Sequence, residues 1–290
     1  MFLMDEKKII SNWNGNLKPI LSISCVTYNH ENFIEDCLNG FLSQETKYPY
    51  EILIHDDAST DDTPNIIKLY QKKYPNIIFP IFQKINQYSQ EIKPNIFNFK
   101  KARGQFIAFC DGDDYWSSNK KIDIQIDYMN LFSECDVSFH GVEVIHLNKK
   151  KENLLANTKP YVYSLNQIIA KDHKLVFSSS SIMIRSNVIS TIPHFYLIAP
   201  VEDYYLRILG AIRGGGLYIP EILSSYRRFT PNSFTLVHQR SPKIALKNYL
   251  TMKEVRKYLN KSFFSIVGIK LVQFYTKYIV LKLIYALKKR

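Results

Sequence analysis

QFIAFCDGDDYW, residues 105–116, is the stretch that decides how the chain folds. Its first part, residues 106–110, is apolar like a buried strand, and it leads directly into Asp111-Gly112-Asp113-Asp114. Carboxylates this close repel one another by about 1–4 kcal/mol per pair, depending on the local dielectric. A cation held by oxygen ligands would relieve this repulsion, and such an ion most often serves a phosphate. The alternative is a plain Asp-Gly turn between two strands.

The segments around this stretch alternate between strand-like and helix-like patterns. Strands are expected at residues 21–26, 51–55, 77–82 and 106–110, helices over 33–42 and 61–74, and a further helix after a cap at Ser117 or Ser118. This order predicts an α/β fold with a mixed, mostly parallel sheet flanked by helices.

Three of the expected strands end in polar clusters. Thr27-Tyr28 follows the first strand, Asp56-Asp57 the second, and Asp111-Gly112-Asp113 the strand at residues 106–110. In open sheets of this type, ligands bind outside the carboxyl ends of the strands. We therefore expect the three clusters to meet at one edge of the sheet and to form a site there.

The second half of the chain is less regular. Its patterns predict strands within residues 136–146, a polar loop over 149–159, a strand over 176–185, a helix over 202–212 and a strand over 217–226. From Pro242 onward the chain is helical and basic, which predicts a C-terminal helical extension.

Taken in order and spacing, three segments resemble the family-2 glycosyltransferases, which have the Rossmann-like GT-A fold. They are SISCVTYNH (22–30), EILIHDDASTDDT (51–63) and FIAFCDGDDYW (106–116), and a weaker resemblance continues through VEDYYLRI (201–208) and YRRF (226–229). The resemblance implies a catalytic domain over residues 18–235. It also implies an inverting, metal-dependent transfer of a hexosyl or N-acetylhexosaminyl group from a nucleotide sugar, expected to be a UDP-sugar.

The resemblance also implies roles for individual residues. Those expected to bind the donor are Thr27, Tyr28, Asp57, Asp111, Asp113 and Arg228. Asp113 would ligate Mn²⁺ or Mg²⁺, with Asp111 contacting the ribose or a metal-bound water, and Asp203 of the Glu202-Asp203 pair would be the catalytic base. Similar enzymes often carry a histidine where this chain has Phe229, which leaves Arg228 or Arg227 to contact the phosphates.

Several of these residues also have a simpler interpretation. Tyr28 is expected either to stack on a uracil ring or to be a half-buried core residue. Asp57 is expected either to accept the uracil N3–H or to cap the following helix. Glu202 and Asp203 are also favoured at a helix N-terminus by the helix dipole alone.

The C-terminal region, residues 240–290, is basic and amphipathic. Within residues 262–290, Lys270, Lys277 and Lys288 fall on nearly the same side of a helix whose other positions are mostly apolar. Such a helix suits either the interface of an anionic membrane or packing against the catalytic domain. No uninterrupted apolar run of about 18 residues is present, so no transmembrane helix is expected.

Composition also suggests where in the cell the protein is located. The four cysteines fit no metal-ligand spacing and no signal peptide opens the chain, which predicts a reducing, cytoplasmic location. The resemblance implies a glycan or glycolipid acceptor such as bacterial lipopolysaccharide, lipooligosaccharide or capsule. Together with the basic C-terminal region, this predicts a peripheral protein on the cytoplasmic face of the inner membrane.

Two other classes of protein are consistent with parts of the sequence. A sugar nucleotidyltransferase would need a glycine-rich phosphate loop near the N-terminus, and residues 20–32 contain no glycine. A nucleic-acid-binding protein would explain the net charge of +12, but the lysines form no recognisable nucleic-acid motif, so no nucleic-acid partner is expected.

Overall fold

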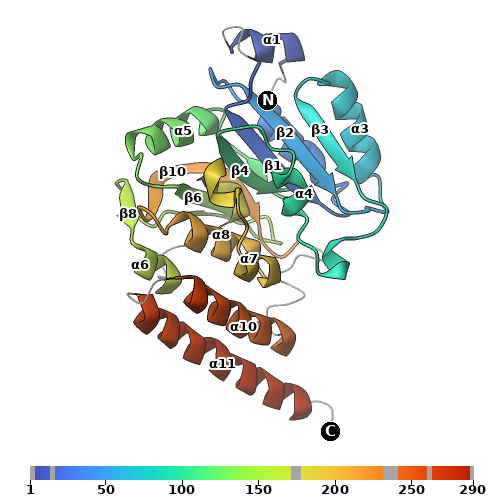
Figure 1. Cartoon of the computed structure of the whole chain (residues 1–290). Coiled ribbons are helices and arrows are strands. Elements are labelled where there is room, and N and C mark those ends of the chain that lie inside the picture. The colour runs from blue at the N-terminus through green and yellow to red at the C-terminus, as the bar shows by residue number, and fades with distance from the viewer. Residues whose placement is uncertain (1–3, 14–16, 171–177, 231–240, 260–262, 288–290) are drawn as a thin grey trace.

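The computed structural model describes residues 4–13, 17–170, 178–230, 241–259 and 263–287. Within them, the centre of the molecule is a ten-stranded sheet with helices packed on both faces and two further helices at one end (Figure 1). The strands are β1 (Leu21–Thr27), β2 (Tyr50–Asp56), β3 (Ile78–Phe82), β4 (Phe106–Asp111), β5 (Tyr115–Trp116), β6 (Val137–Ile145), β7 (Lys151–Leu154), β8 (Tyr161–Tyr163), β9 (Met183–Arg185) and β10 (Gly216–Arg227). The α-helices are α1 (Glu6–Ser11), α2 (Ile34–Leu42), α3 (Thr63–Lys73), α4 (Asn95–Phe99), α5 (Lys121–Leu131), α6 (Leu165–Ala170), α7 (His194–Ile198), α8 (Glu202–Gly210), α10 (Pro242–Tyr258) and α11 (Phe264–Leu287).

The sheet is mixed, and its N-terminal half is parallel. The strand order is β3-β2-β1-β4-β9-β6-β10-β5, with β7 paired to β6 and β8 paired to β10. Strands β1, β2, β3 and β4 run parallel to one another, and β10 runs parallel to β6, whereas the short β9 is antiparallel to both β4 and β6. The predicted α/β fold with a mixed, mostly parallel sheet flanked by helices is therefore confirmed.

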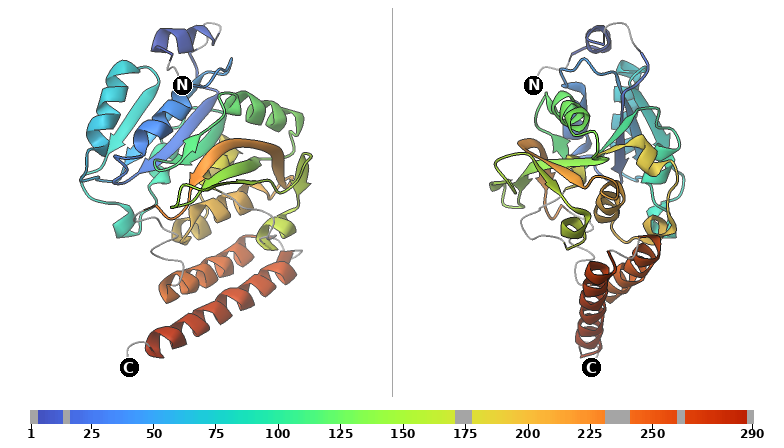
Figure 2. Two further views of the ribbon diagram at one scale, coloured as in Figure 1. Left: turned by 180° about the vertical axis from the view of Figure 1, so that it is seen from behind. Right: turned by 60° about the vertical axis from the view of Figure 1, so that its left-hand side comes forward.

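Alternating side chains of β4 serve two separate apolar cores. Phe106, Ala108 and Cys110 point into the core shared with α2, α3 and α5, while Ile107 and Phe109 point into the core shared with α6, α7 and α8. The period of two residues along a strand produces this division. It also explains why the strand is apolar throughout, since both of its faces are covered, as Figure 2 shows.

Several boundaries differ from the sequence-based expectations. The expected polar loop over residues 149–159 contains β7, which extends a hairpin with β6. The expected strand over 176–185 is only β9, and residues 171–177 lie outside the described part of the chain. Ahead of β9, residues 179–181 form a 3₁₀ turn because the Ser178 hydroxyl accepts a hydrogen bond from the Ser180 amide at 3.2 Å.

The two C-terminal helices, α10 and α11, lie side by side at the end of the molecule away from α1 (Figures 1 and 2). Phe264–Ala286 is long and apolar enough to cross a membrane if length and composition alone are considered, although its lysines interrupt every long apolar run. All four cysteines are buried and free, as expected for a reducing compartment.

Candidate functional site

The carboxyl ends of β1, β2 and β4 and the start of α8 surround a cavity of about 360 Å³. The residues that line it include all but one of those singled out from the sequence: Thr27, Tyr28, Asp57, Asp111, Asp113 and Asp203. The parallel register brings the strand ends together, because Val26 pairs with His55 on one side and with Asp111 on the other. Segments separated by about 150 residues in the sequence thus share one cavity.

Arg228 is the exception. It is exposed beyond the end of β10, and its guanidinium lies 4.9 Å from the centre of the Phe229 ring instead of lining the cavity. The preceding residue, Arg227, lines the cavity, and its Nη1 donates a hydrogen bond to the Asp113 carbonyl at 2.8 Å. Successive residues of an extended chain point to opposite sides, which separates these two arginines.

The acidic turn after β4 is built by short-range contacts. A side chain at Gly112 would place its Cβ 2.5 Å from the Thr27 hydroxyl oxygen, so only glycine fits where the end of β4 meets the end of β1. Asp111 accepts a hydrogen bond from the Ser179 hydroxyl at 2.7 Å, and Asp113 accepts one from the Thr230 hydroxyl at 2.7 Å. Thr230 directly follows Phe229, the position at which similar enzymes often carry histidine.

Burial and mutual repulsion favour the protonated form of two carboxyl groups in this turn. Burial, followed by the charge of Asp113, raises the pKa of Asp111 to about 7. Burial and the same neighbouring charge also hold the pKa of Asp114 well above its usual range. The Asp114 carboxylate holds β10 and the serine turn together, since it accepts hydrogen bonds from the Arg227 amide at 2.8 Å and the Ser178 hydroxyl at 3.1 Å.

The carboxylates of this turn fit a hard divalent cation whose remaining ligands would come from substrate phosphates and water. Among the described residues, no three His, Cys, Asp or Glu side chains are grouped so that they could hold a metal ion by themselves. Mg²⁺ and similar ions are usually held by one or two carboxylates together with substrate phosphates and waters. Asp113 and Asp111 can supply those carboxylates, and a cation there would compensate both the burial and the repulsion that raise the pKa of Asp111.

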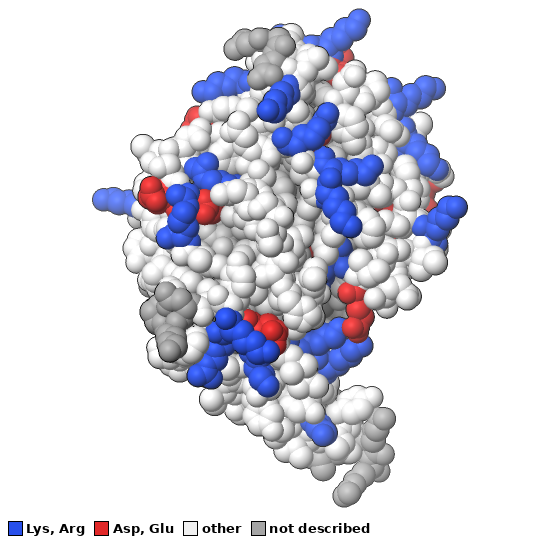
Figure 3. Space-filling view, viewed as in Figure 1, with Lys and Arg blue, Asp and Glu red and all other residues white. Residues whose placement is uncertain are grey.

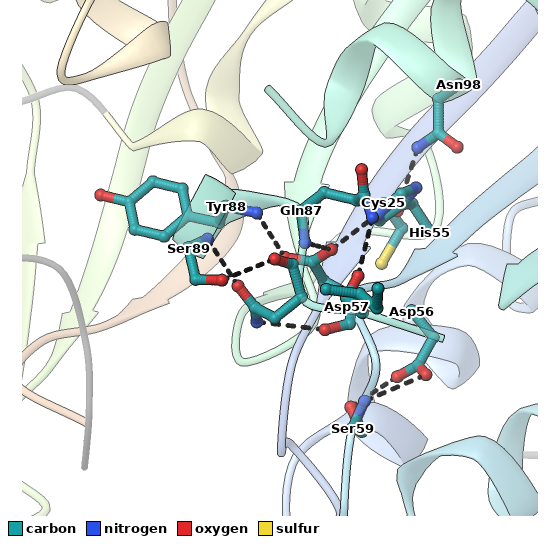
Figure 4. A network of polar contacts seen from close by, with 11 residues as sticks. Cys25, His55, Asp56, Asp57, Ser59, Gln87, Tyr88, Ser89 and Asn98 are labelled. Atoms are coloured by element: carbon teal, nitrogen blue, oxygen red, sulfur yellow. Dashed lines mark hydrogen bonds and ion pairs between the residues drawn. The ribbon is translucent and has the colours of Figure 1, made fainter. Parts of the chain in front are cut away.

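Asp57 lines the cavity, but its carboxylate organises the loop beside it (Figure 4). The backbone amides of Gln87 and Tyr88 donate to its two oxygens at 2.7 and 3.0 Å, and His55 Nε2 lies 3.3 Å from Oδ1. Burial alone would raise the pKa of Asp57, but these hydrogen bonds outweigh it and hold the pKa below its usual value. The helix-cap alternative is wrong, because α3 begins after Asp62.

The loop fixed by Asp57 adds a second aromatic side chain to the cavity. Tyr88 lines the cavity together with Tyr28, and both rings are partly exposed, by 43% and 40%. Tyr28 is therefore not a core residue. Two exposed aromatic rings in a cavity offer flat apolar faces to a base or a sugar.

Glu202 and Asp203 differ in how they are held. Glu202 Oε2 accepts hydrogen bonds from the Asn95 amide at 3.0 Å and from the Tyr196 hydroxyl. Among the described residues, Asp203 accepts a hydrogen bond only from the adjacent Tyr204 amide, and its other oxygen lies 3.6 Å from Arg207, one turn along α8. The Asp203 carboxylate is about a quarter exposed, so a proton donor in the cavity can reach it.

Several residues around the cavity have no signal in the sequence. Lys93 lines the cavity and donates a hydrogen bond to the Ala199 carbonyl, and burial lowers its pKa. Asn95 also accepts a hydrogen bond from Ser24 at 2.7 Å, which ties α4 to β1. These contacts join residues more than 70 positions apart, and a single sequence does not reveal them.

Comparison with known proteins places this geometry in a family. The sequence profile of "Glycosyl transferase family 2" matches residues 22–190, which is more than half of the chain. An uncharacterised protein, Rv1520, of Mycobacterium tuberculosis is 33% identical over 72% of this chain and 58% of its own length. The putative teichuronic acid biosynthesis glycosyltransferase TuaG of Bacillus subtilis is 30% identical over 45% of this chain and 49% of its own.

Solved structures share the fold. The crystal structure of S. aureus TarS (residues 1–349) in complex with UDP-GlcNAc matches 90% of this chain and 72% of its own, with a TM-score of 0.68 and 17% identity. At that identity the likeness is one of fold, and it agrees with the GT-A fold expected from the sequence. The chain spans just over half the length of the mycobacterial relatives, so their whole activity does not transfer to it.

Proposed function

Because this chain belongs to glycosyltransferase family 2, we propose that it transfers a sugar from a UDP-sugar to a hydroxyl group of a bacterial surface glycan. The observation that carries the proposal is the shared cavity lined by Tyr28, Asp111, Asp113 and Asp203. The bound UDP-GlcNAc of TarS supports the donor class, and the teichuronic acid pathway of TuaG supports a surface glycan as acceptor.

In this proposal the donor lies across the carboxyl ends of the strands. Tyr28 stacks on the base next to Thr27, while Asp57 keeps the loop with Tyr88 closed over it and has one lone pair left to accept from the base. Asp113 and Asp111 are the residues that would hold Mn²⁺ or Mg²⁺. The ion, when bound, neutralises the charge of the departing nucleoside diphosphate. Arg227, which lines the cavity, takes the phosphate contact first assigned to Arg228.

Asp203 acts as the base in the transfer step. Its carboxylate removes the proton of the acceptor hydroxyl as the hydroxyl oxygen attacks the anomeric carbon, and the configuration there is inverted. Glu202, held by Asn95 and Tyr196, keeps the start of α8 in place. A positioned base contributes about 10²–10⁴-fold to such a reaction.

We further propose that residues 18–235 form the catalytic unit and that residues 240–290 attach it to the cytoplasmic face of the inner membrane. A growing surface glycan carried on a lipid would be presented at that face. This location is consistent with the four free, buried cysteines.

A screen for UDP release tests the proposal. The purified chain is incubated with a panel of UDP-, GDP- and dTDP-sugars and Mn²⁺, and slow hydrolysis without acceptor is measured. We expect release from one UDP-sugar, loss of release with a chelator, and weaker metal-dependent UDP binding by Asp113→Ala. A chain that binds no nucleotide but retains DNA or RNA in a salt-sensitive way would contradict the proposal.

A further inference from the structure

The face of α11 that points away from α10 is apolar and uncovered. Ile269, Val272, Ile279, Val280 and Leu283 are all exposed, with Val272 at 67% and Leu283 at 60%. At 100° per residue, these five fall within an arc about 100° wide, and Tyr275, Ile284 and Tyr285, which are also exposed, lie outside it. We call these five residues the outer stripe. An arc of this width is what a helix normally buries against a core.

The outer stripe is not the face of α11 that packs against the rest of the protein. Val267 is completely buried, and Leu271 and Phe274 pack against the same core as α10 and α8. These residues lie on the opposite side of the helix. Since α11 already has a packed inner face, the outer stripe is additional apolar surface, and α11 lies at the edge of the molecule in both views of Figure 2.

Positive charge borders the outer stripe on both sides. Lys277 and Lys282 are exposed, and each lies about 110° from the centre of the stripe, in opposite directions. Lys270, expected on the same side as Lys277, is buried towards the inner face, and Lys288 lies outside the described residues. Between its ends, from Phe264 to Leu287, α11 contains no acidic residue.

The charge of the whole chain is concentrated in this region. Residues 240–290 contain thirteen Lys and Arg and a single acidic residue, Glu254, so they carry the entire net charge of +12 while residues 1–239 sum to zero. In Figure 3, basic side chains gather over α10, whereas the surface of α11 is mostly uncharged. A neutral catalytic region is thus joined to a strongly cationic end that has an apolar face.

We propose that the outer stripe docks on an anionic bilayer, with α11 lying in the plane of the interface. The stripe enters the boundary between headgroups and acyl chains, and Lys277 and Lys282 reach up to the anionic headgroups on either side. Charged side chains on both borders fit a helix that lies on the membrane, because a spanning helix would carry them into the hydrocarbon.

Docking of α11 would hold the cavity close to the lipid surface. α10 packs on α11 and is also bonded to the catalytic region, since the Tyr205 hydroxyl of α8 donates to the Asn248 side chain at 3.2 Å. Lys247 of α10 forms an ion pair at 2.8 Å with Glu91, in the loop next to the cavity. The purpose of docking rests on the proposed function, but binding to vesicles is measured without donor or acceptor.

Vesicle flotation of the full-length chain tests the docking surface. We expect binding to phosphatidylcholine vesicles that contain phosphatidylglycerol, little binding to phosphatidylcholine alone, and weaker binding as salt increases. Each basic residue near an anionic surface strengthens binding about fivefold, so Lys277→Glu with Lys282→Glu should weaken it by at least about 20-fold. Val272→Asp with Leu283→Asp should abolish it.

Matched controls sit on the catalytic region. Lys72→Glu with Lys149→Glu makes the same charge change, and Leu69→Asp places an acid at another exposed leucine; both should bind vesicles as the natural chain does. All variants should retain UDP-sugar hydrolysis, so failure of docking and failure of the proposed function are seen separately. Equal loss of vesicle binding in the control pair would overturn the proposal.

A depth measurement separates lying on the membrane from spanning it. Because the four native cysteines are buried, Val272→Cys and Leu283→Cys can each carry a single spin label. The two positions are about 16 Å apart along the helix axis. Equal, shallow depths support the proposal, and depths that differ by most of that distance would show a spanning helix. A stable dimer in solution that protects both labels would show instead that a second copy covers the stripe.

Discussion

The N-terminal half of the sheet and the C-terminal helix α11 distribute apolar residues in opposite ways. In β1, β2 and β4 the apolar residues are buried on both faces, and the functional candidates are the polar residues at the strand ends. In α11 a whole apolar stripe stays outside, and the polar residues only border it. In the sheet, the residues that point to function are the polar ones that line the cavity. In α11, they are the apolar ones that stay exposed on the surface.

The largest expected effect concerns the cavity at the strand ends. Asp203→Asn should reduce sugar transfer by about 10²–10⁴-fold because the amide cannot take the proton of the acceptor. UDP binding, measured by calorimetry, should stay the same, because in the proposed reaction Asp203 contacts the acceptor and not the nucleotide. The matched change Glu202→Gln should cost less, since the Gln side-chain oxygen can still accept from Asn95 and Tyr196. The reverse order of the two variants would assign the base to Glu202.

The next effect concerns the loop that closes the cavity. Asp57→Ala removes the acceptor of the Gln87 and Tyr88 amides, and hydrogen bonds to a charged group contribute about 1.5–3 kcal/mol each. We expect UDP affinity to fall by about 10- to 100-fold and amide hydrogen exchange in residues 83–92 to increase. Ser89→Ala, in the same loop, is the control. Weaker UDP binding with unchanged exchange would mean that Asp57 acts by contacting the base alone.

These two residues also show how far the sequence could be interpreted. The strand ends and their convergence were predictable, because a short continuous apolar run that ends in polar residues specifies both a buried strand and its functional end. The acceptor role of the Asp57 side chain towards Gln87 and Tyr88 was not predictable, since nothing local in DDAST indicates a partner 30 residues away. The positions of Tyr196 and Asn95 depend in the same way on packing between distant elements.

The serine run and the arginine pair show a second limit. Ser178 to Ser181 were expected to continue a strand, but the hydroxyl groups of Ser178 and Ser181 bond to nearby backbone and fold a turn instead. For Arg227 and Arg228, the sequence alone does not tell which of two adjacent, identical side chains points into the cavity. The register of β10 decides which of them lines the cavity.

A third prediction compares lysines in the two regions. Lys121 of α5 is fully buried, 4.5 Å from the centre of the Trp116 ring, whereas Lys277 and Lys282 of α11 are exposed. Burial lowers the pKa of Lys121 to about 7. Between pH 7 and the usual lysine pKa of about 10.4, the unfolded chain therefore binds a proton that the folded chain lacks.

Over that window Lys121 should make stability rise with pH, by up to about 1.4 kcal/mol per unit. Below pH 7 both states are protonated and the penalty of burial is constant. Urea unfolding of the natural chain and of Lys121→Met at pH 7, 8 and 9 measures the difference between the two free energies. The advantage of Lys121→Met should shrink as pH rises. Parallel profiles would show that Lys121 keeps its ordinary pKa.

The smallest expected effect uses two valines on opposite faces of α11. Val272→Asp, in the outer stripe, should change the free energy of unfolding by less than about 0.5 kcal/mol, as exposed substitutions usually do. Val267→Asp places an unpaired charge in the core shared with α10 and should cost several kcal/mol. The chemistry of the two changes is the same, so their difference measures only which face is buried in solution. If Val272→Asp destabilised the chain as much as Val267→Asp, the outer stripe would be covered without any membrane, and a second copy of the chain would be the simplest cover.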